Sequence, residues 1–327
     1  MRPNPHRTLL VVSCTILLAA SYCLAQSPIP QRPRITGISH GGYFVNDLPK
    51  ALVFWHGLLV FDESYDLKKP GSETETRIAF IKINDRQHIE LFNEPPTAPP
   101  NHLSHICFAV DNIEAMRAYL RAKGIDVPAA KAPPAKTRTG DYAFEIKDPD
   151  GTLVEFVQTL PTGLEAQAAG KFLPASRVSG HIYHLGFLVG NSQKSVDFYH
   201  DILGFQETWR GASNPGELSW INMRVPDGTD YVEFMLYSKP PTPGDFGGKN
   251  HIALDVPDLA KAVAAIEARP AFKTYGRTIE IHLGKNGKRQ ANLYDPDGTR
   301  VELMEPFTAD GKPVPPSTAP PPPPAHD

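Results

Sequence analysis

The chain has 327 residues, of which 41% are hydrophobic and 21% are charged, and its formal net charge is −3. This composition is typical of a folded globular protein, and the length suits two domains better than one hydrophobic core. A charge so close to zero, with no basic stripe, argues against nucleic acid as a partner.

The N-terminus has the layout of a secretory signal peptide. Arg2 and Arg7 precede an apolar run over residues 9–20, and the stretch SYCLA that follows offers a plausible cleavage site after Ala25. The run is too short to span a bilayer. We therefore predict a signal peptide over residues 1–25, no membrane insertion, and an exported protein that is periplasmic or extracellular.

The three cysteines agree with this prediction. Cys14 and Cys23 would leave with the signal peptide, so the mature chain would keep only Cys107 and no intramolecular disulfide. A lipoprotein signal is disfavoured, because Cys14 falls inside the apolar run and Cys23 follows the bulky Tyr22. Cys107 lies in the apolar stretch HICFAV and is predicted to be a small core residue without a catalytic role.

Four similar units follow, each read as a strand, a helix and three further strands. Two units make a first domain over residues 34–160, and two make a second domain over residues 181–307. Residues 161–180 contain Gly, Ala, Pro and Ser without a sustained period and are predicted to be the linker. The Pro-rich segment 308–327 is predicted to be a disordered tail. The predicted helices cover residues 50–59, 112–124, 192–204 and 259–269.

One nine-residue pattern occurs twice, as DPDGTLVEF at residues 148–156 and as DPDGTRVEL at residues 295–303. Pro restricts φ, Asp accepts local backbone hydrogen bonds and Gly tolerates a positive φ. Each copy therefore predicts a tight turn that leads into the last strand of its unit.

Histidine and glutamate recur in register with the units. The first strand of each unit carries a His, and the last strand carries a Glu 49 to 51 residues later. Each Glu lies in an apolar strand, where an unpaired carboxylate is costly unless it faces a cation or water. The four pairs are His40 and Glu90, His105 and Glu155, His184 and Glu233, and His251 and Glu302.

Taken together, HLGFLVGNSQKSVDFYHDILGF, NHIALDVPDLAKAV and the two DPDGTxVE strands resemble the vicinal oxygen chelate superfamily. That superfamily includes glyoxalase I, type I extradiol dioxygenases, fosfomycin-resistance enzymes and bleomycin-resistance proteins. The resemblance extends from Ile35 to Pro306. It implies an α+β fold in which four βαβββ modules pair into two domains with curved mixed sheets.

The resemblance also implies a divalent metal inside each domain, held by His from first strands and Glu from last strands. Two imidazoles and two carboxylates suit Ni²⁺, Co²⁺, Zn²⁺, Fe²⁺ or Mn²⁺. The second domain is favoured as the working site, because its helix and strand patterns are more regular than those of the first. The implied ligand sets are His40, Glu90, His105 and Glu155 in the first domain and His184, Glu233, His251 and Glu302 in the second.

Other histidines lie near these positions. His102 and His181 each lie three residues before a predicted ligand, so strand alternation puts them on the opposite face, at strand entries. His88 lies two residues before Glu90 and shares its face, which predicts a supporting role beside the ligands. His282, in a middle strand, points either toward substrate or to the surface.

Three functions remain open on this evidence. The first is a glyoxalase-like isomerase or lyase acting on a small substrate chelated through adjacent oxygens, with Glu302 or Glu155 as the general base. The second is a ring-cleaving dioxygenase with Fe²⁺ or Mn²⁺ on His184, His251 and Glu302. The third is a protein that binds a small molecule without catalysis, as bleomycin-resistance proteins do.

Overall fold

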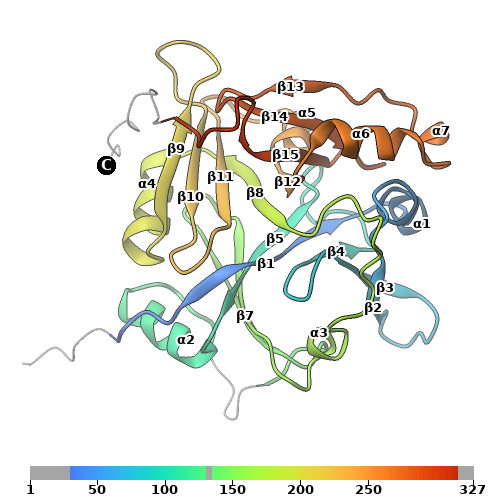
Figure 1. Ribbon diagram of the computed structural model, residues 1–327. Coiled ribbons are helices and arrows are strands. Elements are labelled where there is room, and N and C mark those ends of the chain that lie inside the picture. The colour runs from blue at the N-terminus through green and yellow to red at the C-terminus, as the bar shows by residue number, and fades with distance from the viewer. Residues whose placement is uncertain (1–29, 130–134, 316–327) are drawn as a thin grey trace, which may run out of the picture.

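The computed structural model describes residues 30–129 and 135–315 (Figure 1). The predicted signal peptide and most of the predicted tail therefore lie outside the described residues. Among the helices described, none has the length and apolar character needed to cross a membrane.

Strands and short helices alternate through the first half of the chain. Its elements are β1 (Ile35–Phe44), α1 (Leu48–Leu52), the π-helical η1 (Val53–Leu58), β2 (Glu63–Lys68), β3 (Thr76–Lys82), β4 (His88–Phe92), β5 (Leu103–Val110), α2 (Ile113–Ala122), β6 (Tyr142–Lys147), β7 (Leu153–Gln158) and α3 (Leu164–Gln167).

The second half repeats the same alternation. Its elements are β8 (Ile182–Val189), α4 (Ser192–Asp197), the π-helical η2 (Phe198–Ile202), β9 (Gln206–Gly211), β10 (Trp220–Arg224), β11 (Tyr231–Leu236), α5 (Pro243–Lys249), β12 (His251–Asp255), α6 (Leu259–Glu267), α7 (Phe272–Tyr275), β13 (Ile281–Leu283), β14 (Lys288–Tyr294) and β15 (Arg300–Thr308).

Each half folds into one mixed sheet. The first sheet has 7 strands in the order β2-β3-β4-β1-β5-β7-β6, and the second has 8 in the order β13-β14-β15-β12-β8-β11-β10-β9. In both, the first strands of two units pair antiparallel, and each pairs parallel with the last strand of its own unit. The predicted fold class, with paired modules and mixed sheets, is confirmed.

Local sequence explains where the longer helices begin. The side chains of Asn112, Asn191 and Asp258 precede α2, α4 and α6, and each accepts a hydrogen bond from the backbone N–H three residues later. Such caps satisfy donors that a helix start leaves free. The apolar faces of these helices join one hydrophobic core that runs through both domains.

Three details differ from the sequence-based prediction. After α2, the described part of the second unit has two strands, β6 and β7, rather than three. The predicted linker contains the helix α3, whose Glu165 is buried. Strand β15 continues through Thr308, and a backbone hydrogen bond from Ala309 to Gly287 fastens the following turn, so the fold extends into the segment predicted as tail.

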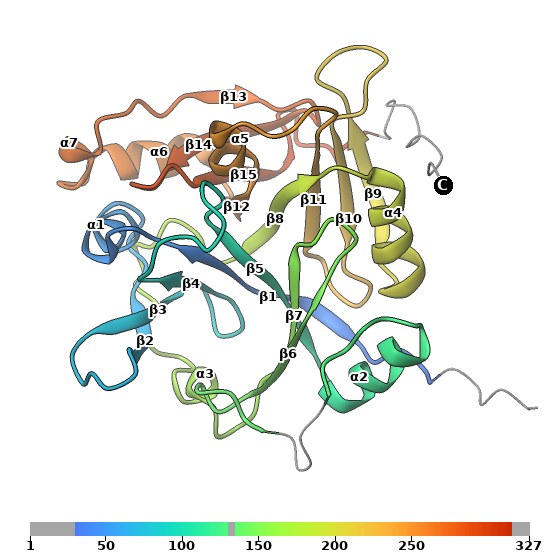
Figure 2. The same ribbon diagram turned by 180° about the vertical axis from the view of Figure 1, so that it is seen from behind.

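The two DPDG turns also join the domains. In each, Gly has a φ of 88°, which explains the glycine. Asp150 of the first turn accepts a hydrogen bond from the Ser195 hydroxyl at the start of α4, at 3.0 Å. Asp297 of the second turn accepts from the Asn46 side chain just before α1, at 2.6 Å. Each domain therefore docks its last turn beside the first helix of the other (Figure 2).

Candidate functional site

The four predicted ligands of the first domain surround two small residues on its sheet. Gly42 of β1 is the register partner of both Glu90 on β4 and His105 on β5. Cys107 of β5 is the partner of both His40 on β1 and Glu155 on β7. Because side chains alternate along strands, all four donors project from the same face.

The donor atoms converge at distances suited to one ion. His40 Nε2 lies 3.0 Å from His105 Nε2, and Glu155 Oε2 lies 3.1 Å from each of these nitrogens. Glu90 is slightly further, with oxygens 3.7 Å from His40 Nε2 and 3.6 Å from His105 Nε2. Ligands about 2.1 Å from a common metal are separated by about 3.0 to 3.4 Å, depending on the angle between them.

A second set of side chains supports this cluster. The ring of His88 stacks on that of His40, with centroids 4.5 Å apart, and its Nε2 lies 3.7 Å from Glu90. His88 Nδ1 lies 3.4 Å from Glu165 of α3, whose carboxylate accepts a hydrogen bond from Tyr65 at 3.0 Å. His88 thus shares the face of Glu90, as predicted. Glu165 belongs to the predicted linker, so that segment also lines the cavity beside the four ligands. We call this cavity, of about 180 Å³, the first hollow.

The charges of the first hollow keep its carboxylates ionised. Burial raises the pKa of Glu155, but hydrogen bonds from His105 and His40 outweigh it, and the net effect lowers the pKa. Burial likewise lowers the pKa of His105, yet Glu155 overcomes this and raises it to about 9. When no metal ion is bound, the protonated imidazole of His105 offsets the negative charge of Glu90 and Glu155.

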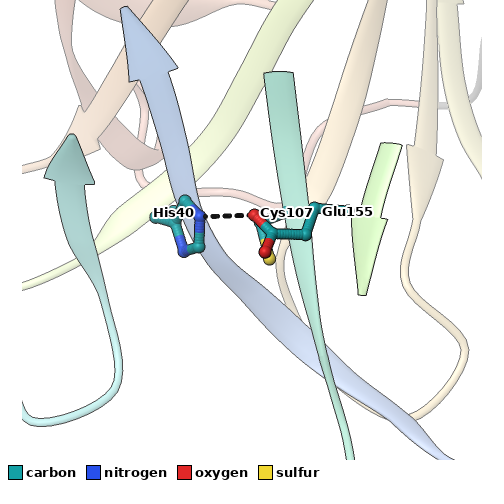
Figure 3. A group of neighbouring side chains, drawn as sticks. All are labelled: His40, Cys107 and Glu155. Carbon is teal, nitrogen blue, oxygen red and sulfur yellow. Dashed lines mark hydrogen bonds and ion pairs between the residues drawn. The ribbon is translucent and has the colours of Figure 1, made fainter. Parts of the chain in front are cut away.

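Cys107 is fully buried, as predicted for a core residue. Its thiol nevertheless faces the cluster: Sγ lies within 4.8 Å of donor atoms of His40 and Glu155 (Figure 3). Burial raises the pKa of the thiol well above its usual value. The Cys107 side chain therefore lies on the sheet face between His40 and Glu155, at the bottom of the donor cluster.

The second domain arranges its predicted ligands in the same way. His184 Nε2 lies 3.0 Å from His251 Nε2, and Glu233 lies 3.9 Å and 3.5 Å from these nitrogens. Glu302 lies 3.7 Å from His251 Nε2. Tyr231 stacks on His184 at 4.5 Å, in the position that His88 occupies beside His40. The cavity beside these residues, about 280 Å³, is called the second hollow.

The electrostatics of the second hollow differ from those of the first. Burial, and then the charge of Glu302, raises the pKa of Glu233 to about 8. Burial, and then the charge of Arg300, holds the pKa of His184 and His251 well below the usual value. Arg300 Nη2 lies 3.6 Å from Glu302 Oε2, so a cation of the chain itself already adjoins one predicted ligand.

The remaining predicted histidines lie outside the donor clusters. His102 and His181 stand at the entries of β5 and β8, where His102 contacts the carbonyl of Phe44 at 2.8 Å and His181 contacts Asp230 at 2.7 Å. His282, whose two possible orientations the sequence left open, is exposed on β13 and lines the second hollow.

Sequence reasoning missed two kinds of site residue. One is the small residue two positions after each first-strand His, namely Gly42, Cys107, Gly186 and Ala253. This pattern, a His followed two residues later by a small residue, is visible in all four units. The small residue lies between the ligand side chains of neighbouring strands and leaves room for them. The other kind is Glu165 and Arg300, for which the sequence offers no signal of its own.

The chain matches the family model Glyoxalase/Bleomycin resistance protein/Dioxygenase superfamily twice, over residues 37–156 and 181–303. It is 26% identical over 231 residues to lactoylglutathione lyase of Schizosaccharomyces pombe, covering 64% of this chain and 68% of the relative. It is 25% identical over 230 residues to glyoxalase I of Saccharomyces cerevisiae, covering 63% of this chain and 64% of the relative. The match thus spans less than two thirds of the latter protein.

Two solved structures show the same fold. Homoprotocatechuate 2,3-dioxygenase from Brevibacterium fuscum, in its complex with 3,4-dihydroxyphenylacetate, superposes with a TM-score of 0.61 at 17% identity, covering 89% of this chain and 88% of that one. The Mn(II)-bound glyoxalase from Novosphingobium aromaticivorans gives a TM-score of 0.61 at 22% identity, covering 88% and 89%.

Proposed function

Because the chain belongs to the Glyoxalase/Bleomycin resistance protein/Dioxygenase superfamily, we propose that it is a divalent-metal-dependent lyase or isomerase of the glyoxalase type. Its substrate would be a small molecule that chelates the metal through adjacent oxygens. The reaction would take place in the first hollow, on His40, Glu90, His105 and Glu155.

One observation carries this proposal: four donors from four strands meet within 3.0 to 3.7 Å in the first hollow. Among the described residues, no Lys or Arg forms an ion pair with Glu90 or Glu155, so a divalent ion could replace the imidazole protons that offset their charge. In the second hollow, by contrast, Arg300 already offsets part of the negative charge of Glu302. This geometry favours the first domain, although its sequence pattern is the less regular one.

When bound, a divalent ion would polarise the substrate oxygens and stabilise negative charge that develops on them. The chain would supply the proton transfer. Glu155, partly accessible from the cavity, is placed to accept a proton from the carbon beside those oxygens. His88 and Glu165 would act as positioning residues, because His88 holds the ring of His40 and Glu165 holds His88.

A ring-cleaving dioxygenase is the second candidate, and one feature of the second hollow favours it. His184, His251 and Glu302 bring one donor atom each within 4.8 Å of one another. Two imidazoles and one carboxylate are the ligands of non-haem Fe(II) oxygenases. Oxygen consumption by the Fe²⁺-loaded protein in the presence of catechol would support this candidate, and its absence would count against it.

Metal binding tests the main proposal. The protein is loaded separately with Mn²⁺, Co²⁺, Ni²⁺, Zn²⁺ and anaerobic Fe²⁺, and the retained ion is quantified after gel filtration. We expect at least one ion per wild-type chain and loss of that ion in Glu155→Gln, while Glu302→Gln retains it. A wild-type protein that retains none of the five would rule the proposal out, and loss in Glu302→Gln alone would move the site to the second domain.

We also propose that the protein is exported with removal of residues 1–25. Arg2 and Arg7 ahead of a short apolar run support this. N-terminal sequencing of protein recovered from the periplasm or medium of an expressing bacterium should then start at Gln26. An intact N-terminus, with the protein retained in the cytoplasm, would contradict export.

A further inference from the structure

The two domains differ in charge at equivalent positions around their hollows. Glu145 pairs with Glu155 across β6 and β7, and Asn292 pairs with Glu302 across β14 and β15. This correspondence aligns the two domains residue by residue. Asp141, four residues before Glu145, then corresponds to Lys288, and Leu153, two before Glu155, corresponds to Arg300. The acidic residues Asp141 and Glu145 of the first hollow therefore have no acidic counterpart in the second domain, and Arg300 adds a positive charge to the second hollow.

Arg300 lies at the centre of this difference. Its side chain is only 13% exposed, yet its guanidinium makes no hydrogen bond to any residue that the structure describes; the nearest carboxylate, Glu302, is 3.6 Å away. Its Nε is buried without a hydrogen-bond partner, and a buried N–H donor that lacks an acceptor is costly. Its fork geometry matches a carboxylate, which accepts two parallel hydrogen bonds.

Other groups on the same face of this sheet also lack partners. Within the described chain, Asn222 Oδ1, Asn292 Oδ1 and Glu302 Oε1 are buried without a hydrogen bond. Buried polar atoms in folded proteins are nearly always satisfied, so a group of unsatisfied ones along one sheet face points to something bound there. Of these residues, only Glu302 lines the second hollow itself. Asn222 and Asn292 stand opposite Glu233 and Glu302 in the sheet register and share their face, so the unsatisfied atoms mark this face, together with the hollow on it, as a binding surface rather than as packed core.

The walls of the second hollow determine what shape would fit. Trp209 and Trp220 line one side, with their rings stacked at 6.5 Å and 25°. Met235, Met304, Lys285 and Arg300 are also among the lining residues. At about 280 Å³, the cavity is at the lower end of the range for small-molecule sites. It suits a flat apolar body of one ring with a charged group at its edge.

We propose that the second hollow binds a small organic carboxylate whose flat apolar body packs against Trp209 and Trp220 while its anionic group pairs with Arg300. Glu233 and Glu302 line the same hollow and repel an anion, so the carboxylate would pair with the part of the Arg300 guanidinium that lies away from both. This inference does not depend on metal in the first hollow.

Benzoate and its uncharged isostere benzamide are the probes. Each is titrated into the full protein by calorimetry, with tryptophan fluorescence as a second signal from Trp209 and Trp220. We expect benzoate to bind at least tenfold more tightly than benzamide. In Arg300→Leu, which installs the residue type that the first domain has at this position, benzoate affinity should fall at least tenfold. Arg300→Lys keeps the positive charge but not the two parallel N–H donors, so benzoate affinity should fall less in this variant than in Arg300→Leu.

Two further variants separate this inference from the proposed metal site. Arg138 lines the first hollow, so Arg138→Leu is the matched control and should leave benzoate binding unchanged. Glu155→Gln, which removes the proposed ion, should also leave it unchanged. Equal binding of benzoate and benzamide by wild-type protein would overturn the inference without requiring any variant to fold. Loss of benzoate binding in Glu155→Gln or Arg138→Leu would do the same, because it would place the anion in the first hollow.

Discussion

Gly42→Ala is expected to lower the affinity of the first hollow for a divalent ion by about 10- to 100-fold, although all four donor side chains remain. Gly42 stands between Glu90 and His105 in the sheet register. A Cβ at this position would overlap the His105 ring and press on Phe92. The ring must then rotate away from His40, and the donor atoms no longer meet.

Gly186→Ala provides the mirror experiment, since a Cβ there would overlap His251 in the second hollow. Gly248→Ala is the neutral control, because nothing lies within 4 Å of the added atom. Ion retention after gel filtration and a competitive chelator titration measure the effect. If Gly42→Ala binds metal like wild type while Gly186→Ala does not, the first hollow is not the metal site.

Asp295→Asn is expected to stabilise the protein at pH 8 by on the order of 2–4 kcal/mol. Asp295 is 4% exposed, and burial, opposed by a backbone hydrogen bond from Thr299, raises its pKa to about 7. Asn keeps the oxygen that accepts from the backbone of Asp297 and Thr299. It removes the charge that the folded protein must otherwise bury in the turn.

The sign follows from proton linkage. Between the unfolded pKa of 3.8 and about 7, folded Asp295 holds a proton that the unfolded chain has released, so wild-type stability falls as pH rises through this window. The gain from Asp295→Asn should therefore be absent below pH 4 and full above pH 7. Urea unfolding at pH 4, 5.5, 7 and 8 measures it, and Asp148→Asn, where the pKa is raised to about 6, should show a smaller gain. A variant less stable than wild type at pH 8 would contradict the burial argument.

The sequence by itself determined the fold and which His and Glu side chains come together on each sheet. Periodic apolar residues, helix caps such as Asn112 and turns such as residues 148–151 act locally, so they can be read without knowing the tertiary contacts. The His and Glu positions could be read as well, because duplication repeated them at a constant distance. The structure brings both predicted quartets together, each on one face of its own sheet.

Only the tertiary structure decided how the two sites differ. Glu165 reaches the first hollow from a segment without periodicity, and only its contacts with His88 and Tyr65 in the folded chain reveal its place there. Arg300 looks like an ordinary strand residue in the sequence. Its position beside Glu302, and the absence of a cation at Leu153, emerge only when the strands are aligned. Charge balance in a buried site depends on which side chains from distant strands share it, and no local pattern contains that information.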